Sequence, residues 1–205
     1  LSSGLVGEAR KEGQRVLDTL MPYVERGVPV VGLEPSCLLS LRDEFSGLFP
    51  GQGTRELAKQ AMLFEEFLVA EHDAGRLKLD LQAVGKSKAL IHGHCHQKAF
   101  GVMPAVERVL GWVPGLDTEL IESGCCGMAG AFGYEEEHYD MSMKMAELDL
   151  LPTVRESGDD TVIVADGVSC RCQIRDGAGR NGLHVARVLE LALGGKGAQP
   201  GPLSG

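Results

Sequence analysis

The sequence lacks the features that define several classes of protein. No apolar run is long enough to cross a bilayer, and the N-terminal segment does not have the profile of a signal peptide. Runs of basic residues are also absent, and the net charge is −9. This balance argues against a surface that binds nucleic acid or anionic membranes. Without an export signal, the chain is expected to be cytoplasmic, where thiols stay reduced.

The composition that remains is typical of a folded protein. The 205 residues are enough for one or two compact domains, and 43% apolar with 24% charged residues excludes wholesale disorder. The chain opens with Leu1 rather than Met, in sequence that reads as the middle of a helix. We therefore expect it to be a fragment of a longer protein.

The hydrophobic pattern alternates between helical and strand-like segments. Helical spacing predicts helices over 5–26, from about 37, over 54–72, 97–110 and 135–151, from 169, and over 183–193. Short apolar runs predict strands over 28–33, 88–91, 119–121 and 161–165. Such alternation is typical of an α/β fold with a largely parallel sheet. The Gly- and Pro-rich segment 194–205 is expected to be a flexible tail.

An internal repeat divides the chain. Residues 28–43 can be aligned with residues 161–176, so that Ser-Cys and Arg-Asp pairs coincide in the two copies. Chance similarity between two generic βα units is the alternative. The repeat predicts two βα-type domains, 1–85 with a connecting helix and 86–193, the first truncated at its N-terminus. Because a Cys-Cys-Gly sequence precedes the second copy, the parent chain is expected to carry another one upstream.

The cysteines are placed unevenly. Five of the six lie between Cys95 and Cys172; Cys125 and Cys126 are adjacent, and Cys170 is one residue away from Cys172. A disulfide between adjacent cysteines needs a strained ring, so these pairs point instead to metal or redox chemistry in a reducing compartment. The alternative is that the cysteines are scattered and buried as small hydrophobic residues.

The clustered cysteines all follow predicted strands. Because the carboxyl ends of parallel strands share one edge of a sheet, we expect the loops with Cys95, with Cys125 and Cys126, and with Cys170 and Cys172 to meet there. Thiolates that converge from separate loops are the ligands that iron–sulfur clusters require. The sequence therefore predicts an iron–sulfur site at this edge.

A glycine-rich loop surrounds the adjacent cysteines. Gly124, Gly127 and Gly130 recur at every third position, and such a loop can adopt positive φ angles and turn backbone N–H groups towards a buried anion. We predict that these three glycines bind the cofactor. A nucleotide phosphate is the weaker alternative, because the spacing matches neither of the usual phosphate-binding loops.

Three histidines flank Cys95. If the segment is extended, His92, His94 and His96 point to one side and Cys95 to the other. A zinc site of histidine and cysteine is one interpretation; histidines that shield the cluster, tune it or simply pack in the core are the other.

Four motifs together resemble the cysteine-rich CCG domain family. They are Glu-Pro-Ser-Cys at 34–37, His-Gly-His-Cys-His-Gln-Lys-Ala at 92–99, Ser-Gly-Cys-Cys-Gly-Met-Ala-Gly-Ala-Phe-Gly-Tyr at 123–134 and Val-Ser-Cys-Arg-Cys-Gln-Ile at 168–174. The family includes the iron–sulfur subunit of glycolate oxidase, the C subunit of anaerobic glycerol-3-phosphate dehydrogenase and the B subunit of heterodisulfide reductase. The nearest resemblance is to the C-terminal part of FAD-linked D-lactate or glycolate dehydrogenases.

The resemblance implies an electron-transfer role. A 2-hydroxy acid would reduce FAD in a preceding flavin domain, and iron–sulfur centres, one in a ferredoxin-like domain, would carry the electrons to an acceptor. The acceptor, or a partner that anchors the parent protein to a membrane, lies outside this sequence. The fragment has no recognisable flavin site, so no complete active site is expected in it.

The resemblance also implies a ligand set. Cys95, Cys125, Cys126 and Cys170 match the family pattern, Cys172 comes one residue early, and Cys37 corresponds to the last cysteine of the first repeat. A [4Fe-4S] cluster with four or five of these thiolates is implied. Zinc is the alternative, in a domain that is structural or docks the flavin unit to a partner; a third reading is a thiol catalyst that cycles Cys125 and Cys126 through a disulfide.

Overall fold

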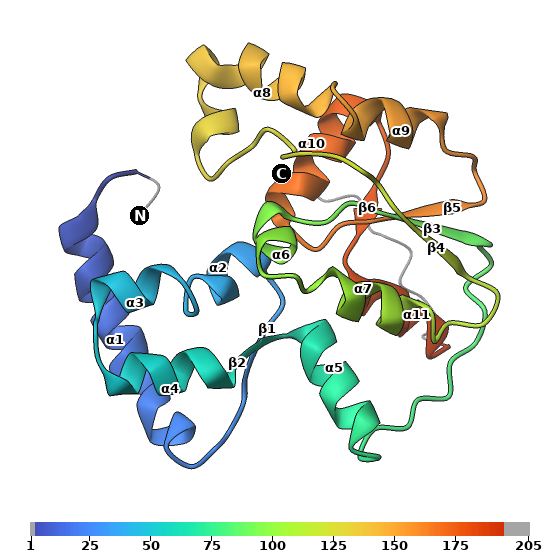
Figure 1. Cartoon of the computed structure of the whole chain (residues 1–205). Coiled ribbons are helices and arrows are strands. Elements are labelled where there is room, and N and C mark those ends of the chain that lie inside the picture. The colour runs from blue at the N-terminus through green and yellow to red at the C-terminus, as the bar shows by residue number, and fades with distance from the viewer. Residues whose placement is uncertain (1–2, 195–205) are drawn as a thin grey trace.

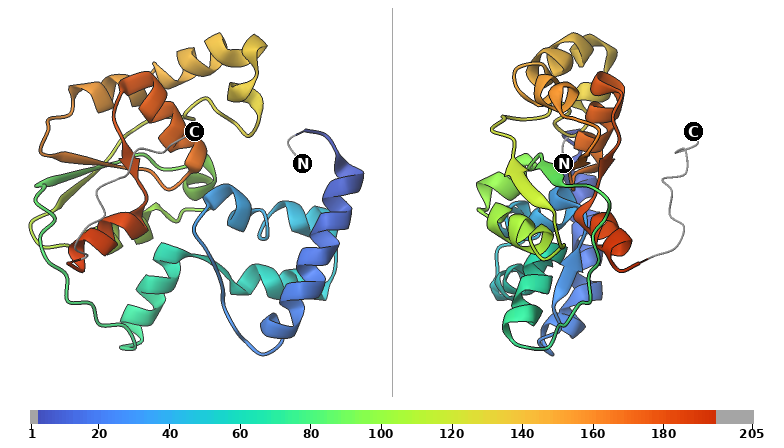
Figure 2. Two further views of the ribbon diagram at one scale, coloured as in Figure 1. Left: turned by 180° about the vertical axis from the view of Figure 1, so that it is seen from behind. Right: turned by 90° about the vertical axis from the view of Figure 1, so that its right-hand side faces the viewer.

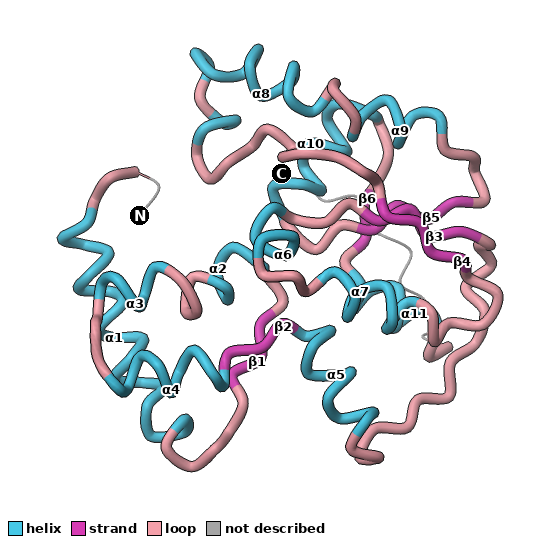
Figure 3. Tube along the Cα trace, viewed as in Figure 1, coloured by secondary structure: helices cyan, strands magenta, loops and turns pink. Residues whose placement is uncertain are grey.

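The computed structural model describes residues 3–194, which form an α/β protein with two parallel sheets (Figures 1 and 3). The predicted fold class and the parallel pairing of the strands are confirmed. Apart from Gly194, the predicted flexible tail lies outside the described residues. Among residues 3–194, none of the helices has both the length and the apolar character needed to cross a bilayer.

The N-terminal unit is helical around a small sheet. Strands β1 and β2 pair in parallel, with Val30 opposite Ala61 and Gly32 opposite Leu63. A buried cluster that includes Leu17, Leu39 and Leu57 fills the space between the helices of this unit. The elements in chain order are α1 (Val6–Val24), β1 (Val30–Gly32), α2 (Pro35–Leu39), α3 (Glu44–Leu48), α4 (Gln52–Gln60), β2 (Ala61–Leu63) and α5 (Phe64–Asp73).

The single helix predicted over 54–72 is wrong, because strand β2 divides it into α4 and α5. The guanidinium of Arg42 explains the break. Its Nε donates a hydrogen bond to the Ala61 carbonyl at 2.8 Å, and its two terminal nitrogens donate to the Glu66 carboxylate. Glu66 in turn accepts the Leu63 amide at 2.9 Å and so starts α5. These contacts come from 19 and 24 residues away in the sequence, so helical periodicity cannot report them.

The C-terminal unit is built on a four-stranded parallel sheet. Its strand order is β4-β3-β5-β6, and Ile91 at the end of β3 lies between Leu120 of β4 and Val164 of β5. Its strands are β3 (Lys88–Ile91), β4 (Asp117–Leu120), β5 (Thr161–Val164) and β6 (Gly182–Leu183). Its helices are α6 (Cys95–Ala99), α7 (Met103–Leu110), α8 (Tyr139–Ala146), α9 (Leu150–Glu156), α10 (Val168–Ala178) and α11 (Val185–Ala192), with two 3-10 turns, η1 (Phe132–Tyr134) and η2 (Glu136–His138).

Three predicted helices of this unit have different boundaries. The helix over 97–110 is two helices, because Gly101 adopts a left-handed φ of 66° and a new helix begins at Met103, with Pro104 in its first turn. The helix over 135–151 is divided into η2, α8 and α9. Leu183 belongs to strand β6, which the sequence did not predict, and α11 therefore begins two residues later than expected.

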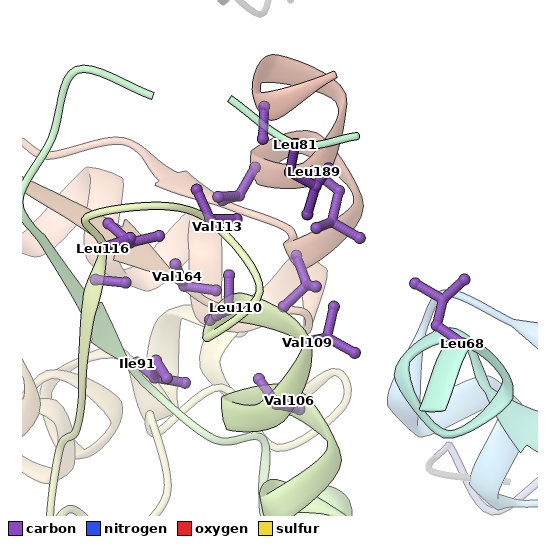
Figure 4. Packing of buried hydrophobic residues seen from close by; sticks show 14 of the residues in the cluster. Leu68, Leu81, Ile91, Val106, Val109, Leu110, Val113, Leu116, Val164 and Leu189 are labelled. Carbon is purple, nitrogen blue, oxygen red and sulfur yellow. The ribbon is translucent and has the colours of Figure 1, made fainter. Parts of the chain in front are cut away.

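Helices cover both faces of the larger sheet (Figures 1 and 2). On one face, α7 and α11 bury Val109, Leu110 and Leu189 against Ile91 and Val164 (Figure 4). The other face packs against α8, α9 and α10 through a second apolar cluster: Leu90, Ile121, Cys126, Met128, Ala146, Leu150, Leu151, Val154, Ile163, Ala165, Cys170 and Ile174. The second cluster contains two cysteines, so this core extends to the strand ends where the thiols were predicted.

The two units repeat one arrangement and contact each other. In each of them a strand leads directly into a Ser-Cys helix and pairs in parallel with a later strand, as β1 with β2 and β5 with β6. At the carboxyl ends of β1 and β5, the Val168 amide donates to Glu34 Oε2 at 3.0 Å, and His184 Nε2 lies 2.8 Å from the Leu33 carbonyl oxygen. Arg108 of α7 also pairs with Asp73 at the end of α5. The junction therefore extends from the carboxyl ends of β1 and β5 to helices α5 and α7.

Candidate metal centre

The thiols gather at the carboxyl edge of the larger sheet. Loops that leave β3, β4 and β5 bring their cysteines to one cavity of about 700 Å³, and helix α2 supplies the facing wall. The cysteines that line this cavity are Cys37, Cys95, Cys125, Cys126 and Cys170. All six cysteines of the chain are free thiols. The parallel topology thus places at one site residues that are up to 133 positions apart in the sequence.

The deepest part of the cavity holds a pair of buried thiols. Cys126 and Cys170 are 4% and 1% exposed, and their Sγ atoms share a hydrogen bond of 3.4 Å. This bond from Cys126, with help from His92, holds the pKa of Cys170 well below its usual value. Cys170 also lies in the first turn of α10, where the helix dipole favours a thiolate. Hydrogen bonds with Cys125 and Cys170, together with burial, raise the pKa of Cys126, so the pair is one thiolate and one thiol.

A second pair lies nearer the surface. Cys95 and Cys125 share a hydrogen bond, and the Gly127 amide donates to Cys125 Sγ at 3.4 Å. Hydrogen bonds from Cys126, Cys95 and the backbone lower the pKa of Cys125 to about 2, whereas the bond to Cys125 and burial raise the pKa of Cys95. The thiolate is therefore favoured at Cys125 and at Cys170, and a metal that binds all four sulfurs would release the protons that remain on them.

The glycine-rich loop is closely packed at one glycine. Gly127 has a φ of 93°, and a Cβ there would lie 2.2 Å from the Ser142 carbonyl oxygen, so no other residue fits. This conformation turns its amide towards Cys125, as expected for a loop that cradles an anion. Gly130 has a φ of 68° and lines the cavity. Gly124 has open space around its Cα, and its carbonyl accepts a hydrogen bond from Lys98.

The three histidines do not share one extended segment, because α6 begins at Cys95. His92 is buried, with Nδ1 3.0 Å from Ser123 Oγ, and a ring nitrogen of His92 and the sulfurs of Cys126 and Cys170 lie within 4.8 Å of one another. His94 Nδ1 accepts the His96 amide and caps α6, and burial lowers the pKa of His94, which keeps it neutral. Of the three, His92 has a ring nitrogen within this distance of two sulfurs, whereas His94 and His96 line the cavity.

Two predicted ligands do not belong to these two pairs. Cys37 is exposed, on the wall of the cavity that α2 provides. Cys172 does not line the cavity; it lies beside Tyr134. The two pairs formed by Cys95 with Cys125 and Cys126 with Cys170 are therefore the compact set in this part of the chain.

Two residues that the sequence reading did not select complete the site. Lys98 donates to the carbonyl oxygens of Ser123 and Gly124, and burial lowers its pKa while the neighbouring thiols favour its charge. Gly167 allows a close approach, since a Cβ there would lie 2.6 Å from the His94 ring and 3.2 Å from Cys170 Sγ. Gly167 could have been predicted from the sequence, because it lies directly before the helix that contains Ser169 and Cys170.

The fold and the site define a class of protein: a parallel α/β module that gathers cysteine thiolates for metal or redox chemistry. Comparison with known proteins agrees with this class. The chain is 27% identical over 194 residues to the C subunit of anaerobic glycerol-3-phosphate dehydrogenase from Escherichia coli strain K12. It is also 26% and 29% identical to D-2-hydroxyglutarate dehydrogenases from Escherichia coli strain K12 and Pseudomonas putida.

The matches cover nearly all of this chain but only part of each relative. They span 94% of the chain and 48% of the glycerol-3-phosphate dehydrogenase component, and 91% of the chain and 17–18% of the two D-2-hydroxyglutarate dehydrogenases. No protein-family model matches the chain, and no solved structure matches it with significance. The chain is homologous to a portion of these dehydrogenase proteins, and the resemblance to anaerobic glycerol-3-phosphate dehydrogenase that the motifs indicated is confirmed.

Proposed function

We propose that the chain is the iron–sulfur electron-transfer module of an FAD-linked 2-hydroxyacid oxidoreductase. The observation that carries the proposal is the convergence of Cys95, Cys125, Cys126 and Cys170 from three strand ends, with the pKa of Cys125 and of Cys170 lowered. Iron–sulfur clusters need thiolate ligands that approach from several directions. The homology to D-2-hydroxyglutarate dehydrogenases, whose name states a 2-hydroxy acid, supports the substrate class.

The donor set fits a [4Fe-4S] cluster. Its four sulfurs lie in a cavity large enough for a compact inorganic group, and the Gly127 amide and Lys98 ammonium supply positive charge beside them. Hydrogen bonds to cluster sulfurs and nearby charge are the means by which a protein adjusts a cluster's reduction potential. When bound, the cluster would accept one electron from reduced flavin and pass it on.

In this proposal the chain's own residues hold and insulate the centre. His92 lies beside Cys126 and Cys170, Met128 belongs to the apolar cluster that contains both cysteines, and both residues are buried. The exposed side faces Cys37 and α2, where Cys95 is also exposed. Electrons would therefore enter or leave on the side of α2, and the flavin domain, a ferredoxin-like domain and the electron acceptor are the partners that we propose for that exchange.

A zinc ion is the second candidate, because one observation favours it. His92, Cys126 and Cys170 present one nitrogen and two sulfurs within 4.8 Å of one another, and zinc is commonly bound by such sets. Zinc would make the module structural, a docking domain within the same oxidoreductase.

Metal analysis separates the two candidates. The chain is expressed and purified without oxygen, and iron, acid-labile sulfide and zinc are measured per chain. Four irons with four sulfides and a broad visible absorption are expected for the proposal. One zinc per chain without sulfide would overturn the iron–sulfur proposal in favour of the structural zinc module. The absence of both metals would overturn both candidates.

A further inference from the structure

A buried carboxyl group lies at the junction of the two units, away from the thiols. Glu65, in the first turn of α5, is 2% exposed, and its Oε1 atom has no hydrogen-bond partner among the described residues. A buried polar atom without a partner is costly, and such exceptions mark sites with a specific role. Nothing in the electron-transfer proposal uses this residue.

Two titratable residues of the C-terminal unit face Glu65. Asp166, which follows β5, and His184, which begins α11, each place an atom within 4.8 Å of a Glu65 oxygen and of each other. The remaining charge nearby is on Glu66 of the same helix, which pairs with Arg42. Strands β1 and β2 carry no titratable residue, and Arg108 of α7 pairs with Asp73 at the far end of α5.

The neighbours of Glu65 are already fully hydrogen-bonded. Asp166 accepts the Val185 amide at 3.0 Å and Gln97 Nε2 at 2.8 Å, so each of its two oxygens already has a donor. His184 Nδ1 accepts the Ala186 amide, so its proton is on Nε2, which points to the Leu33 carbonyl. A metal ion at this site would need a free lone pair on His184 Nε2, but that nitrogen carries the proton. We therefore expect the unpartnered oxygen of Glu65 to bind a proton rather than a metal ion.

Asp166, which lies beside Glu65, is connected to the thiol site by a short series of hydrogen bonds. Gln97 donates from Nε2 to Asp166 and accepts on Oε1 the amide of His94, at 3.0 Å. His94 precedes Cys95 and packs beside Cys170 across Gly167. The residues of this series, Asp166, Gln97 and His94, are all buried, and charges interact more strongly in such surroundings than in water.

We propose that Glu65 binds the proton that accompanies reduction of the thiol-bound centre, with Asp166 and Gln97 as the positioning residues between them. This inference rests on the proposed electron-transfer function. In the step, reduced flavin gives one electron to the centre, and one solvent proton forms an O–H bond on the Glu65 carboxylate. The added negative charge at the centre favours that proton, and by reciprocity a deprotonated Glu65 makes the centre harder to reduce.

The electrostatics of Glu65 place this proton exchange at mildly alkaline pH. Burial first, and then the charge of Asp166, raise the pKa of Glu65 to about 8. The coupling is therefore expected to be visible around and above that pH, where the oxidised protein begins to lose the proton.

The test uses the anaerobic, cluster-loaded chain and two variants. Glu65→Gln removes the proton site without changing the size of the side chain. Glu71→Gln, on the same helix and paired with Arg76, is the control for the loss of one carboxylate. The midpoint potential is measured from pH 6 to 10, and infrared difference spectra between the reduced and oxidised states record the carbonyl stretch of protonated carboxyl groups.

The expected result is a potential that falls as the pH rises through about 8 in the wild type and in Glu71→Gln, but not in Glu65→Gln. A carboxyl band that appears on reduction and is absent from Glu65→Gln is expected as well. Equal pH dependence in all three proteins, or a band unaffected by the substitution, would overturn the inference. A chain without iron and sulfide would instead overturn the proposed function, and this coupling with it.

Discussion

The Sγ atoms of Cys126 and Cys170 lie 3.4 Å apart, although 44 positions separate the two residues in the sequence. The distance results from parallel pairing, because β5 leads to Cys170 and β4 leads to Cys126 at the same edge of the sheet. A thiolate and a thiol that share one hydrogen bond are ready to bind a soft metal once the remaining proton leaves.

Replacing Cys126 is expected to abolish the centre. Cys126→Ser removes one of the four sulfurs that converge, and bound iron and sulfide should fall by roughly tenfold or more. Cys172→Ser is the matched control, because Cys172 does not line the cavity, and it should keep the iron and sulfide of the wild type. Loss of iron in the Cys172 variant would show instead that a fifth thiolate takes part. Iron, sulfide and visible absorption are the measurements.

Gly127→Ala is expected to destabilise the chain by roughly 2–4 kcal/mol, because the residue needs a φ of 93° and the new Cβ would meet the Ser142 carbonyl at 2.2 Å. Gly124→Ala, where nothing lies within 4 Å of the new atom, should change the free energy of unfolding by less than about 1 kcal/mol. Urea denaturation of the metal-free proteins gives both values. Similar losses in the two variants would contradict the packing described for this loop.

Lys98→Met is expected to raise the pKa of the metal-free thiols, because the ammonium group lies beside the thiol loop and stabilises the thiolates. The rate of alkylation as a function of pH measures this shift. Lys59→Met serves as the control, since Lys59 is exposed on α4 and pairs with Glu56. Identical alkylation profiles for wild type and Lys98→Met would show that backbone amides alone hold the thiolates.

The stability of the metal-free chain should depend on pH through Glu65. The pKa of Glu65 is raised from 4.5 to about 8, so the folded state binds this proton more tightly than the unfolded state. Its contribution is fully present below about pH 4.5 and is lost as the pH rises through about 8, by roughly 5 kcal/mol at most. Unfolding of wild type and Glu65→Gln at pH 5, 7 and 9 tests the sign: the variant should be relatively more stable at high pH.

The sequence was sufficient for those parts of the structure that local patterns determine. The βα alternation, the strands that lead to Cys95 and Cys170, and the tight turn at Gly127 follow from periodicity and from the position of glycine. Strands β2 and β6 escaped prediction because each has at most three residues and forms by pairing with a distant strand.

The chemistry of the site was also only partly predictable. Cysteine is a strong signal, so residue type and spacing selected the four sulfurs, but Cys37 and Cys172 were predicted as ligands with them. Lys98 and Glu65 could not, because their roles depend on contacts with loops 25 and 101 positions away. A charged residue in a helix reads as a solvent-exposed one until the neighbouring element is known.

The cavity has two walls of different origin, and this has a mechanical consequence. The four sulfurs belong to the edge of one rigid sheet, whereas Cys37 and Glu34 belong to α2 and the turn before it, which the Glu34–Val168 contact ties to the other unit. The positions of the four sulfurs therefore depend on the sheet edge, whereas the shape of the mouth depends also on how the Glu34–Val168 contact holds α2 against it.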